Sequence, residues 1–247
     1  MRLPIGHDGI PAHDEIGWGQ IAFEAGSIAG AAALIVIHIN RLIVTDLSWS
    51  WPLLLAVACG AICVDFASGI LHWFADTWFQ ETMPFLGRRL LRPFRVHHVN
   101  PDDFLRRNFI DTNGDVAMVC DLAMLAMLAI PLDRQAGLWW DVMLLAASLA
   151  GLPTNQIHQW AHSRQPPPFV GWLQRRGIIL SRADHQRHHA PPYNDFYCIA
   201  IGWLNRPLST IQFFRRLEAL IIRLTGLQPR EDDTKFVHDV RKRRTNA

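Results

Sequence analysis

Charged residues are scarce in this chain, and lysine and tyrosine are scarcer still. Only 19% of the 247 residues are charged, and the sequence holds two lysines and two tyrosines but ten tryptophans. Half of the residues are apolar, and the mean hydropathy is positive. Tryptophan favours the membrane–water interface. This composition argues against a soluble protein and indicates a membrane protein, and a net charge of only +2 gives no reason to expect a nucleic-acid partner.

Neither a CxxC pair nor a secretory signal is evident in the sequence. The four cysteines stand mostly in apolar runs without CxxC spacing, which argues against a disulfide framework or a zinc ribbon. The first twenty residues hold acids and histidines and lack the charged start and apolar core of a secretory signal. No internal repeat or linker interrupts the sequence, so we expect residues 1–247 to form a single domain.

Four apolar stretches approach the ~20 residues that a membrane-spanning helix needs. They are residues 21–39, 52–75, 116–132 and 138–157. The third is short and contains Asp121, and Pro153 predicts a kink in the fourth, whose helix we expect to continue to His162. The sequence therefore predicts an all-α integral membrane protein with about four transmembrane helices.

The segment that follows, residues 158–230, is too polar to cross the membrane. Residues 169–180 and 207–225 alternate apolar and basic residues at helical spacing, which predicts interfacial amphipathic helices. Pro207 and Gly226 would be the first residue and the C-cap of the second helix. A core helix of a soluble domain is the alternative interpretation. Residues 231–247 form a polar tail.

The distribution of basic residues predicts the orientation of the four spans. Two short loops, near Arg41 and Arg134, hold two of the 24 Lys and Arg residues, and the other 22 lie on the opposite side. Cytoplasmic segments carry the excess of Lys and Arg in membrane proteins. We therefore expect a multi-pass membrane protein with a cytoplasmic helical cap.

An HxxHH pattern, formed by His185, His188 and His189, predicts a metal site. Ser181 followed by Asp184 resembles a capping box, so a helix is expected here, and two prolines would end it. Positions i, i+3 and i+4 lie on one face of a helix, where the three imidazoles would converge. The alternative interpretation is a solvated helix end that is merely rich in polar residues.

Five more histidines stand at spacings that suit a metal site. His158 and His162 share one helix face, and His72 shares a stripe with Asp65, Gly69 and Asp76. His97 and His98 are adjacent. All eight histidines fall on the predicted cytoplasmic side, although the topology was assigned without them. The remaining four histidines have no partner at ligand spacing, and we expect no metal role for them: they are His7, His13, His38 and His238.

Eight imidazoles exceed what one tetrahedral ion uses, so the count favours two metal ions. Imidazole suits iron, zinc, copper or nickel. A site at the membrane surface indicates a lipid-chain substrate, and cleaving an unactivated C–H bond needs oxidising chemistry, whereas zinc would indicate a hydrolase. Asp65, Asp76 and Asp184 are expected to accept hydrogen bonds from ligand N–H groups and so to support catalysis indirectly.

A non-catalytic metal-binding or transport protein is the alternative from another class. A transporter would place acids and histidines along a path through the middle of the membrane. Here only Asp65 and Asp121 fall inside the predicted spans, and the histidines gather on one side. The pattern therefore favours an enzyme.

Several motifs in a fixed order resemble a known family. They are Asp65-x6-His72-Trp73-x2-Asp76, Arg95-x-His97-His98-x2-Pro101, Asn155-x2-His158-x3-His162, His185-x2-His188-His189-x-Pro191, Tyr197-Cys198-Ile199 and Gly202-Trp203-Leu204-Asn205. Together they are similar to the plasmanylethanolamine desaturases, whose relatives include a plastid desaturase that acts on phosphatidylglycerol. The resemblance covers roughly residues 50–210.

The resemblance implies a membrane enzyme that uses O2 and two non-haem iron ions held by the eight histidines. The reaction would convert the 1-O-alkyl chain of an ethanolamine phospholipid into the vinyl ether of a plasmalogen. Zinc is an expected substitute for iron in a purified form. An external electron donor such as cytochrome b5 or a ferredoxin is also implied, because no flavin or nicotinamide motif is visible. A related di-metal acyl-lipid desaturase or hydroxylase would share the same histidines.

Overall fold

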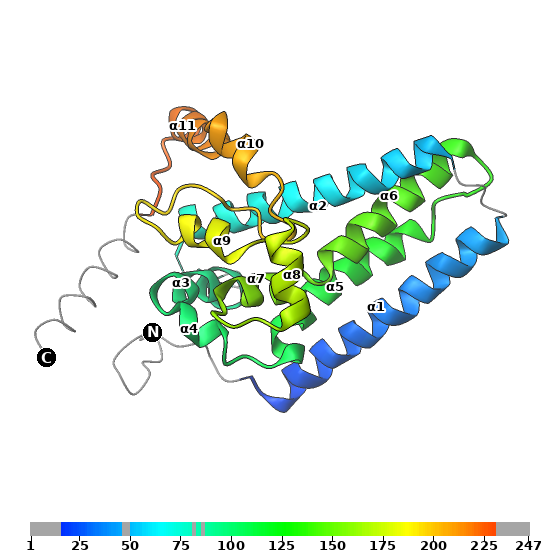
Figure 1. Cartoon of the computed structure of the whole chain (residues 1–247), viewed down its shortest axis with the longest axis horizontal. Coiled ribbons are helices and arrows are strands. Elements are labelled where there is room, and N and C mark those ends of the chain that lie inside the picture. The colour runs from blue at the N-terminus through cyan, green and yellow to red at the C-terminus, as the bar shows by residue number, and fades with distance from the viewer. Residues whose placement is uncertain (1–15, 46–49, 81–82, 85–86, 231–247) are drawn as a thin grey trace, which may run out of the picture.

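The structure is a computed structural model that describes residues 16–45, 50–80, 83–84 and 87–230. These residues form helices and connecting segments and contain no strand (Figure 1). Three of the helical stretches are long and apolar enough to cross a membrane. They are α1 (Trp18–Val44), α2 (Trp51–Thr77) and residues Gln135–His162, which comprise α6 (Gln135–Gly151) and α7 (Thr154–His162). The all-helical class and the membrane character of the chain are therefore confirmed.

A fourth long helix, α5 (Phe109–Met127), differs from the predicted stretch of residues 116–132. It begins seven residues earlier because the Asn108 side chain accepts a hydrogen bond from the Asp111 backbone N–H and caps the helix. The early start adds acids to an apolar helix, and α5 is not among the three candidate spans. Leu152 and Pro153 separate α6 from α7, at the position where the kink was predicted.

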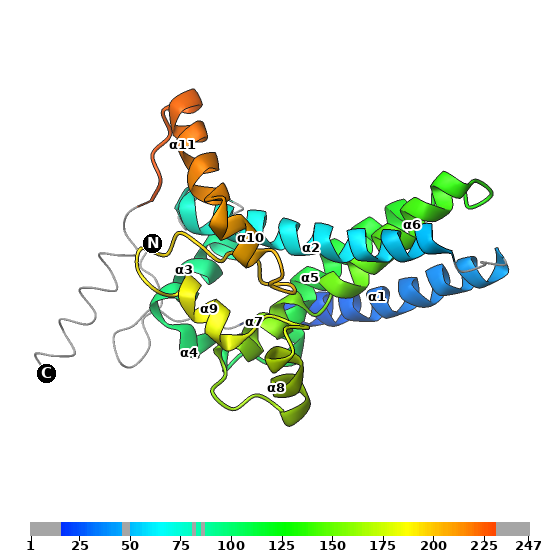
Figure 2. The same ribbon diagram turned by 45° about the horizontal axis from the view of Figure 1, so that its top comes forward.

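The long helices pack in two close pairs, α2 with α6 and α1 with α5 (Figures 1 and 2). Glycine permits the closest approaches. A Cβ atom at Gly60 of α2 would lie 2.2 Å from the Met143 carbonyl oxygen of α6, and one at Gly114 of α5 would lie 2.3 Å from Cβ of Glu24 in α1. The backbones are therefore near contact, and apolar side chains fill the remaining space.

A polar cluster connects α1, α5 and α6 at the end of the long helices that lies away from the eight motif histidines. The Arg41 guanidinium donates to Asp141, to the carbonyl of Met127, the last residue of α5, and to the carbonyl of Ile130, three residues further on. Nε2 of His38 lies 2.9 Å from the Met124 carbonyl oxygen. Asp141 and His38 are fully buried. Arg41 and His38 are thus held by structural contacts, and these contacts account for both residues without a role in chemistry.

The shorter helices gather at the opposite end of the long helices and form a cap (Figures 1 and 2). The cap comprises the π-helical turn η1 (Gly87–Leu91), α3 (Arg92–Val99), α4 (Pro101–Phe104), α8 (Pro168–Arg175), α9 (Arg182–His188), α10 (Asn205–Thr210) and α11 (Phe213–Thr225). Ser181 caps the predicted helix, because its hydroxyl accepts from the Asp184 backbone N–H at the start of α9.

The two predicted amphipathic helices are shorter than expected. The first, α8, ends before Gly177, whose positive φ of 65° suits the left-handed turn there. The second is broken into α10 and α11 at Gln212, where φ is 53°. The break lets Phe214 pack on Tyr197, while Ile211, an apolar residue three positions earlier, is 51% exposed. Gly226 caps α11 as predicted.

Replacing Gly60 tests the close approach of α2 to α6. We expect Gly60→Ala to lower the free energy of unfolding by about 1–3 kcal/mol, because the added methyl group meets a backbone oxygen that has little room to move. Gly26→Ala in α1 is the matched control, since a Cβ there has no neighbour within 4 Å. Equilibrium unfolding in detergent micelles measures both. Equal effects of the two substitutions would contradict this packing.

Candidate metal centre

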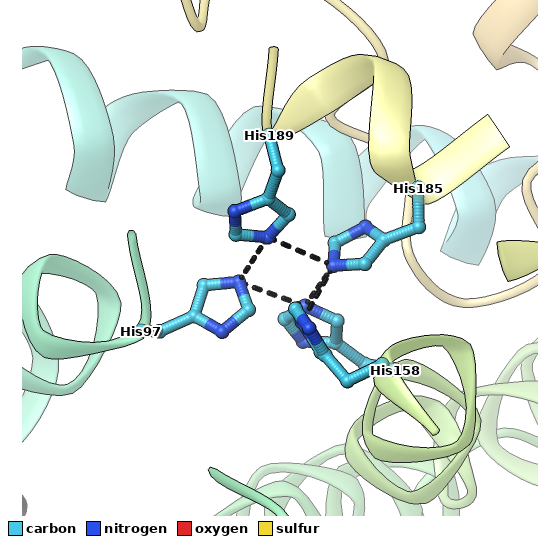
Figure 3. A group of neighbouring side chains, drawn as sticks. His97, His158, His185 and His189 are labelled. Atoms are coloured by element: carbon cyan, nitrogen blue, oxygen red, sulfur yellow. Dashed lines mark hydrogen bonds between the residues drawn. The ribbon is translucent and has the colours of Figure 1, made fainter. Parts of the chain in front are cut away.

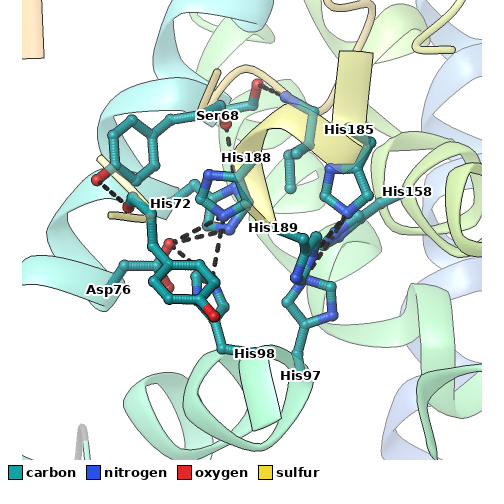
Figure 4. A network of polar contacts seen from close by, with 12 residues as sticks. Ser68, His72, Asp76, His97, His98, His158, His185, His188 and His189 are labelled. Atoms are coloured by element: carbon teal, nitrogen blue, oxygen red, sulfur yellow. Dashed lines mark hydrogen bonds and ion pairs between the residues drawn. The ribbon is translucent and has the colours of Figure 1, made fainter. Parts of the chain in front are cut away.

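All eight histidines predicted from the motifs meet at the cap end of the long helices, and Figure 4 labels each of them except His162. They form two groups, each with ligand atoms within 4.8 Å of one another. The five-histidine group consists of His97, His158, His162, His185 and His189. The mixed group consists of His72, Asp76, His98 and His188. The groups adjoin, because His97 and His98 are neighbours in α3 and His188 and His189 are neighbours at the end of α9.

Four rings of the five-histidine group face a common point (Figure 3). Their Nε2 atoms follow one another around a ring, with separations of 3.1 Å from His97 to His158, 3.0 Å to His185, 3.1 Å to His189 and 3.0 Å back to His97. Nε2 of the fifth ring, His162, lies 2.7 Å from Nε2 of His185. Helices α3, α7 and α9 each contribute at least one ring.

These separations fit a metal ion with more than four ligands. In a square with edges of about 3.0 Å, the centre lies about 2.1 Å from each corner, which is the usual length of a bond from imidazole nitrogen to a metal ion. In a tetrahedron with the same bond length, the nitrogens would lie about 3.4 Å apart. Five donors also exceed the four of a structural zinc site.

The mixed group places a carboxylate among three imidazoles. One oxygen of Asp76, Oδ2, lies 3.2 Å from Nε2 of His72, 3.1 Å from that of His98 and 3.3 Å from that of His188. All four residues are buried. Asp76 was predicted to accept a hydrogen bond from a ligand N–H; its Oδ2 lies close enough to three Nε2 atoms for such a bond, and it also belongs to a group that could hold an ion.

Hydrogen bonds on the far side of two rings fix which nitrogen is free to bind. Nδ1 of His72 lies 3.0 Å from the Tyr197 carbonyl, and Nδ1 of His188 lies 2.9 Å from the Asp195 carbonyl. A carbonyl only accepts, so each Nδ1 donates, and in the neutral ring Nε2 then carries a lone pair. Both lone pairs face the Asp76 carboxylate. A cation between these acceptors removes the repulsion, and imidazole with carboxylate is a common metal-ligand set.

Burial keeps the histidines of the five-histidine group neutral. Desolvation, reinforced by neighbouring histidines, holds the pKa of His97, His185 and His189 well below the ordinary value. Their rings are therefore unprotonated near pH 7 and can donate a lone pair to a metal ion, which protonated rings cannot do.

The other two predicted acids bind backbone and side-chain groups away from the imidazoles. Asp184 accepts from Ser181 at the start of α9 and contacts Arg206. Asp65 accepts from the backbone N–H groups of residues 201, 202 and 204. Among the described contacts, neither acid accepts from a ligand histidine, which differs from the predicted arrangement.

Sequence reasoning did not identify the two carbonyl acceptors, and it did not place the Asp76 carboxylate among the possible ligand atoms of the mixed group. Backbone carbonyls leave no mark in a sequence: Tyr197 stood in one of the family motifs without a role, and Asp195 had no signal. Asp76 did have one, because it lies four residues after His72 and the pair shares one helix face.

The family model of the lipid desaturase domain matches residues 61–232, which include both groups. The chain belongs to the lipid desaturase family. It is 40% identical to the plasmanylethanolamine desaturase of Myxococcus xanthus over 86% of this chain and 75% of the relative. It is 41% identical to plasmanylethanolamine desaturase 1 of Mus musculus over 76% of this chain and 72% of the relative.

A third relative of this lipid desaturase is less similar. Chloroplastic fatty acid desaturase 4 of Arabidopsis thaliana is 32% identical over 71% of this chain and 54% of the relative. No solved structure matches the chain. The family resemblance predicted from the histidine motifs is therefore confirmed.

Metal loading should stabilise this desaturase. An ion that binds only the folded chain adds about 2.7 kcal/mol per site at a free concentration 100 times its Kd. We expect ferrous ion to raise the unfolding midpoint in detergent, and His158→Ala combined with His188→Ala to abolish the rise. His38→Ala, which alters a buried histidine outside both groups, should retain it. An undiminished rise in the double variant would place the ion elsewhere.

Proposed function

We propose that this chain is a plasmanylethanolamine desaturase, which introduces the vinyl ether double bond of a plasmalogen. The substrate is an ethanolamine phospholipid with a 1-O-alkyl chain. The observation that carries this assignment is the pair of adjoining donor groups, which holds every histidine of the family motifs. Relatives with this activity in their names are 40% and 41% identical, whereas the fatty acid desaturase is 32% identical.

The two groups each bind one iron ion in this proposal. His97, His158, His162, His185 and His189 hold one ion, and His72, His98, His188 and Asp76 hold the other. Asp76 is a ligand in this assignment and not only a hydrogen-bond acceptor. The negative charge of Asp76 partly balances the positive charge of the second ion. The five neutral imidazoles provide no such charge for the first ion. Bound iron supplies the activation of O2 that removal of hydrogen from an alkyl chain requires.

The net reaction is a four-electron reduction of O2. Two hydrogens, one from each of the two chain carbons next to the ether oxygen, leave with two electrons as the double bond forms. Two more electrons come from an external donor of the cytochrome b5 or ferredoxin type. With two further protons from water, O2 becomes two water molecules.

The protein contributes a dry, rigid setting for this reaction. His72 and His188 are 0% exposed, and His185 is 1% exposed. Aromatic rings enclose the histidines: Phe94 packs on His72 with ring centroids 5.0 Å apart, and Phe104 packs on His158 at 5.1 Å. Excluding bulk water protects the oxidising centre from side reactions.

A membrane substrate explains the apolar surface of the cap. Phe169 and Trp172 of α8 stack on each other while being 68% and 43% exposed, and Leu224 of α11 is 73% exposed. Helices of this kind lie in the interface between lipid and water. We propose that α8, α10 and α11 rest on the membrane beside the site and that the whole chain is one desaturase domain.

The proposed topology has four membrane crossings, by α1, α2, α5 and the stretch of α6 and α7. Both donor groups lie in the cap at one end of these helices (Figure 1). Arg41, in the last turn of α1, and Arg134, which precedes the first residue of α6, lie at the ends of these helices that face away from the cap (Figure 1). The excess of basic residues on the cap side supports a cytoplasmic location of the metal centre.

Product analysis tests the assignment directly. Expressed in cells that contain alkyl ether lipids, the chain should form acid-labile vinyl ether phospholipids with O2 and none without it. We expect His97→Ala, His188→Ala and Asp76→Ala each to reduce product by at least about 100-fold, because loss of a ligand or of its support weakens metal binding.

His38→Ala is the control for these variants, since its ring is equally buried but belongs to neither group. It should keep more than half of the wild-type product at equal protein level. If new double bonds appeared only in acyl chains, the substrate would be an acyl lipid, as for the fatty acid desaturases, and the proposed alkyl ether substrate would be wrong. Product formation without O2 would overturn an oxidative mechanism.

A further inference from the structure

A buried, irregular segment of the cap crosses the face of α2 next to the mixed group. We call residues 195–205 the strap. Residues 196–201 are buried and form no regular helix. A buried backbone N–H without an acceptor is costly, so each must find a partner outside a helix or sheet.

Two side chains of α2 accept hydrogen bonds from five backbone N–H groups of the strap. The Ser68 hydroxyl accepts from the N–H groups of residues 199 and 200 at 3.1 and 3.2 Å. Oδ1 of Asp65 accepts from residues 201 and 202 at 2.9 and 2.7 Å, and Oδ2 accepts from residue 204 at 2.9 Å. Ser68 in turn donates to the Asp65 carbonyl. Asp65 is 0% exposed.

The strap also lies close against α2. A Cβ atom at Gly69 would lie 2.6 Å from Sγ of Cys198 and 3.3 Å from the Phe214 ring. Asn205 closes the segment on itself, because its side chain accepts from the Cys198 N–H and donates to the Cys198 carbonyl. The position of the strap is therefore fixed by α2 on one side and by its own closure on the other.

The strap carries the two carbonyls that orient metal ligands. Those of Tyr197 and Asp195 accept from Nδ1 of His72 and of His188, respectively. Both histidines belong to the mixed group. In the five-histidine group, by contrast, Nδ1 of His97 and of His185 has no hydrogen-bond partner within the described part of the chain. Both of these hydrogen bonds between carbonyls of the strap and ligand histidines therefore go to the mixed group.

We propose that Asp65, assisted by Ser68, is a positioning residue that sets the iron affinity of the mixed group through the strap. This inference rests on the proposed function, in which each group binds one iron ion. Removing the Asp65 charge loosens the strap at residues 201–204, and the Tyr197 and Asp195 carbonyls then no longer hold His72 and His188 in the orientation that binds the ion.

Iron content separates this role from a general effect on folding. Wild-type protein loaded with ferrous ion in detergent should hold two ions per chain. Asp65→Asn keeps the shape of the side chain, but it replaces one carboxylate oxygen by an NH2 group. That NH2 group cannot accept a hydrogen bond from the backbone N–H of the strap that it faces. We expect this variant to hold about one ion, and Mössbauer spectra of iron-57 samples to lose the component of one site while the other stays unchanged.

Asp141→Asn is the matched control, because Asp141 is an equally buried carboxylate at the far end of the long helices. It should lower stability but keep two ions per folded chain. If Asp65→Asn does not fold, Ser68→Ala gives the same test by removing two strap hydrogen bonds without a change of charge. It should weaken one iron site by about 10- to 100-fold and leave the other unchanged.

Three results would overturn the proposal. The first is that folded Asp65→Asn, or Ser68→Ala if that variant is measured in its place, binds two ions with unchanged affinity. The second is that this variant loses both ions together. The third is that Asp141→Asn selectively loses one ion. The proposed function fails in a different way, since wild-type protein would then bind fewer than two ions or give no vinyl ether.

Discussion

The convergence of electron-pair donors in a dry interior is the constraint on which the structure depends. Nε2 atoms about 3.0 Å apart, and a carboxylate among them, concentrate acceptor atoms that a cation between them would satisfy together. Burial lowers the pKa of His97, His185 and His189, so each ring is neutral and has one nitrogen lone pair to offer an ion. The remaining architecture brings these donors together from segments distant in sequence and holds them in place.

One face of α2 serves both the metal centre and the segment that supports it. Asp65, Ser68, Gly69, His72 and Asp76 follow at helical spacing, so the four side chains and Gly69 lie on the same side of the helix. The first three anchor the strap and give it room, and the last two join the mixed group. A rigid helix therefore fixes the distance between the strap anchors and the ligands, which a loop could not do as accurately.

The long helices and the cap differed in how well local patterns predicted them. Apolar runs predicted α1 and α2 to within a few residues, because helices of this kind are set by local composition. The predicted helix at residues 207–225 broke at Gln212, because Phe214 packs on Tyr197 and the chain must turn to bring it there. That contact joins segments far apart in sequence, and periodicity within one segment does not reveal it.

The sequence by itself determined the helical class, the apolar spans, the eight histidines and the family, since all of these depend on residue type and on spacing within a segment. Tertiary structure alone decided how the histidines divide into two groups and which acid stands among them. Asp65 and Asp76 lie on the same helix stripe, yet one binds backbone amides and the other faces imidazoles. Their roles differ because each meets a different distant segment, and only folding determines which segment that is.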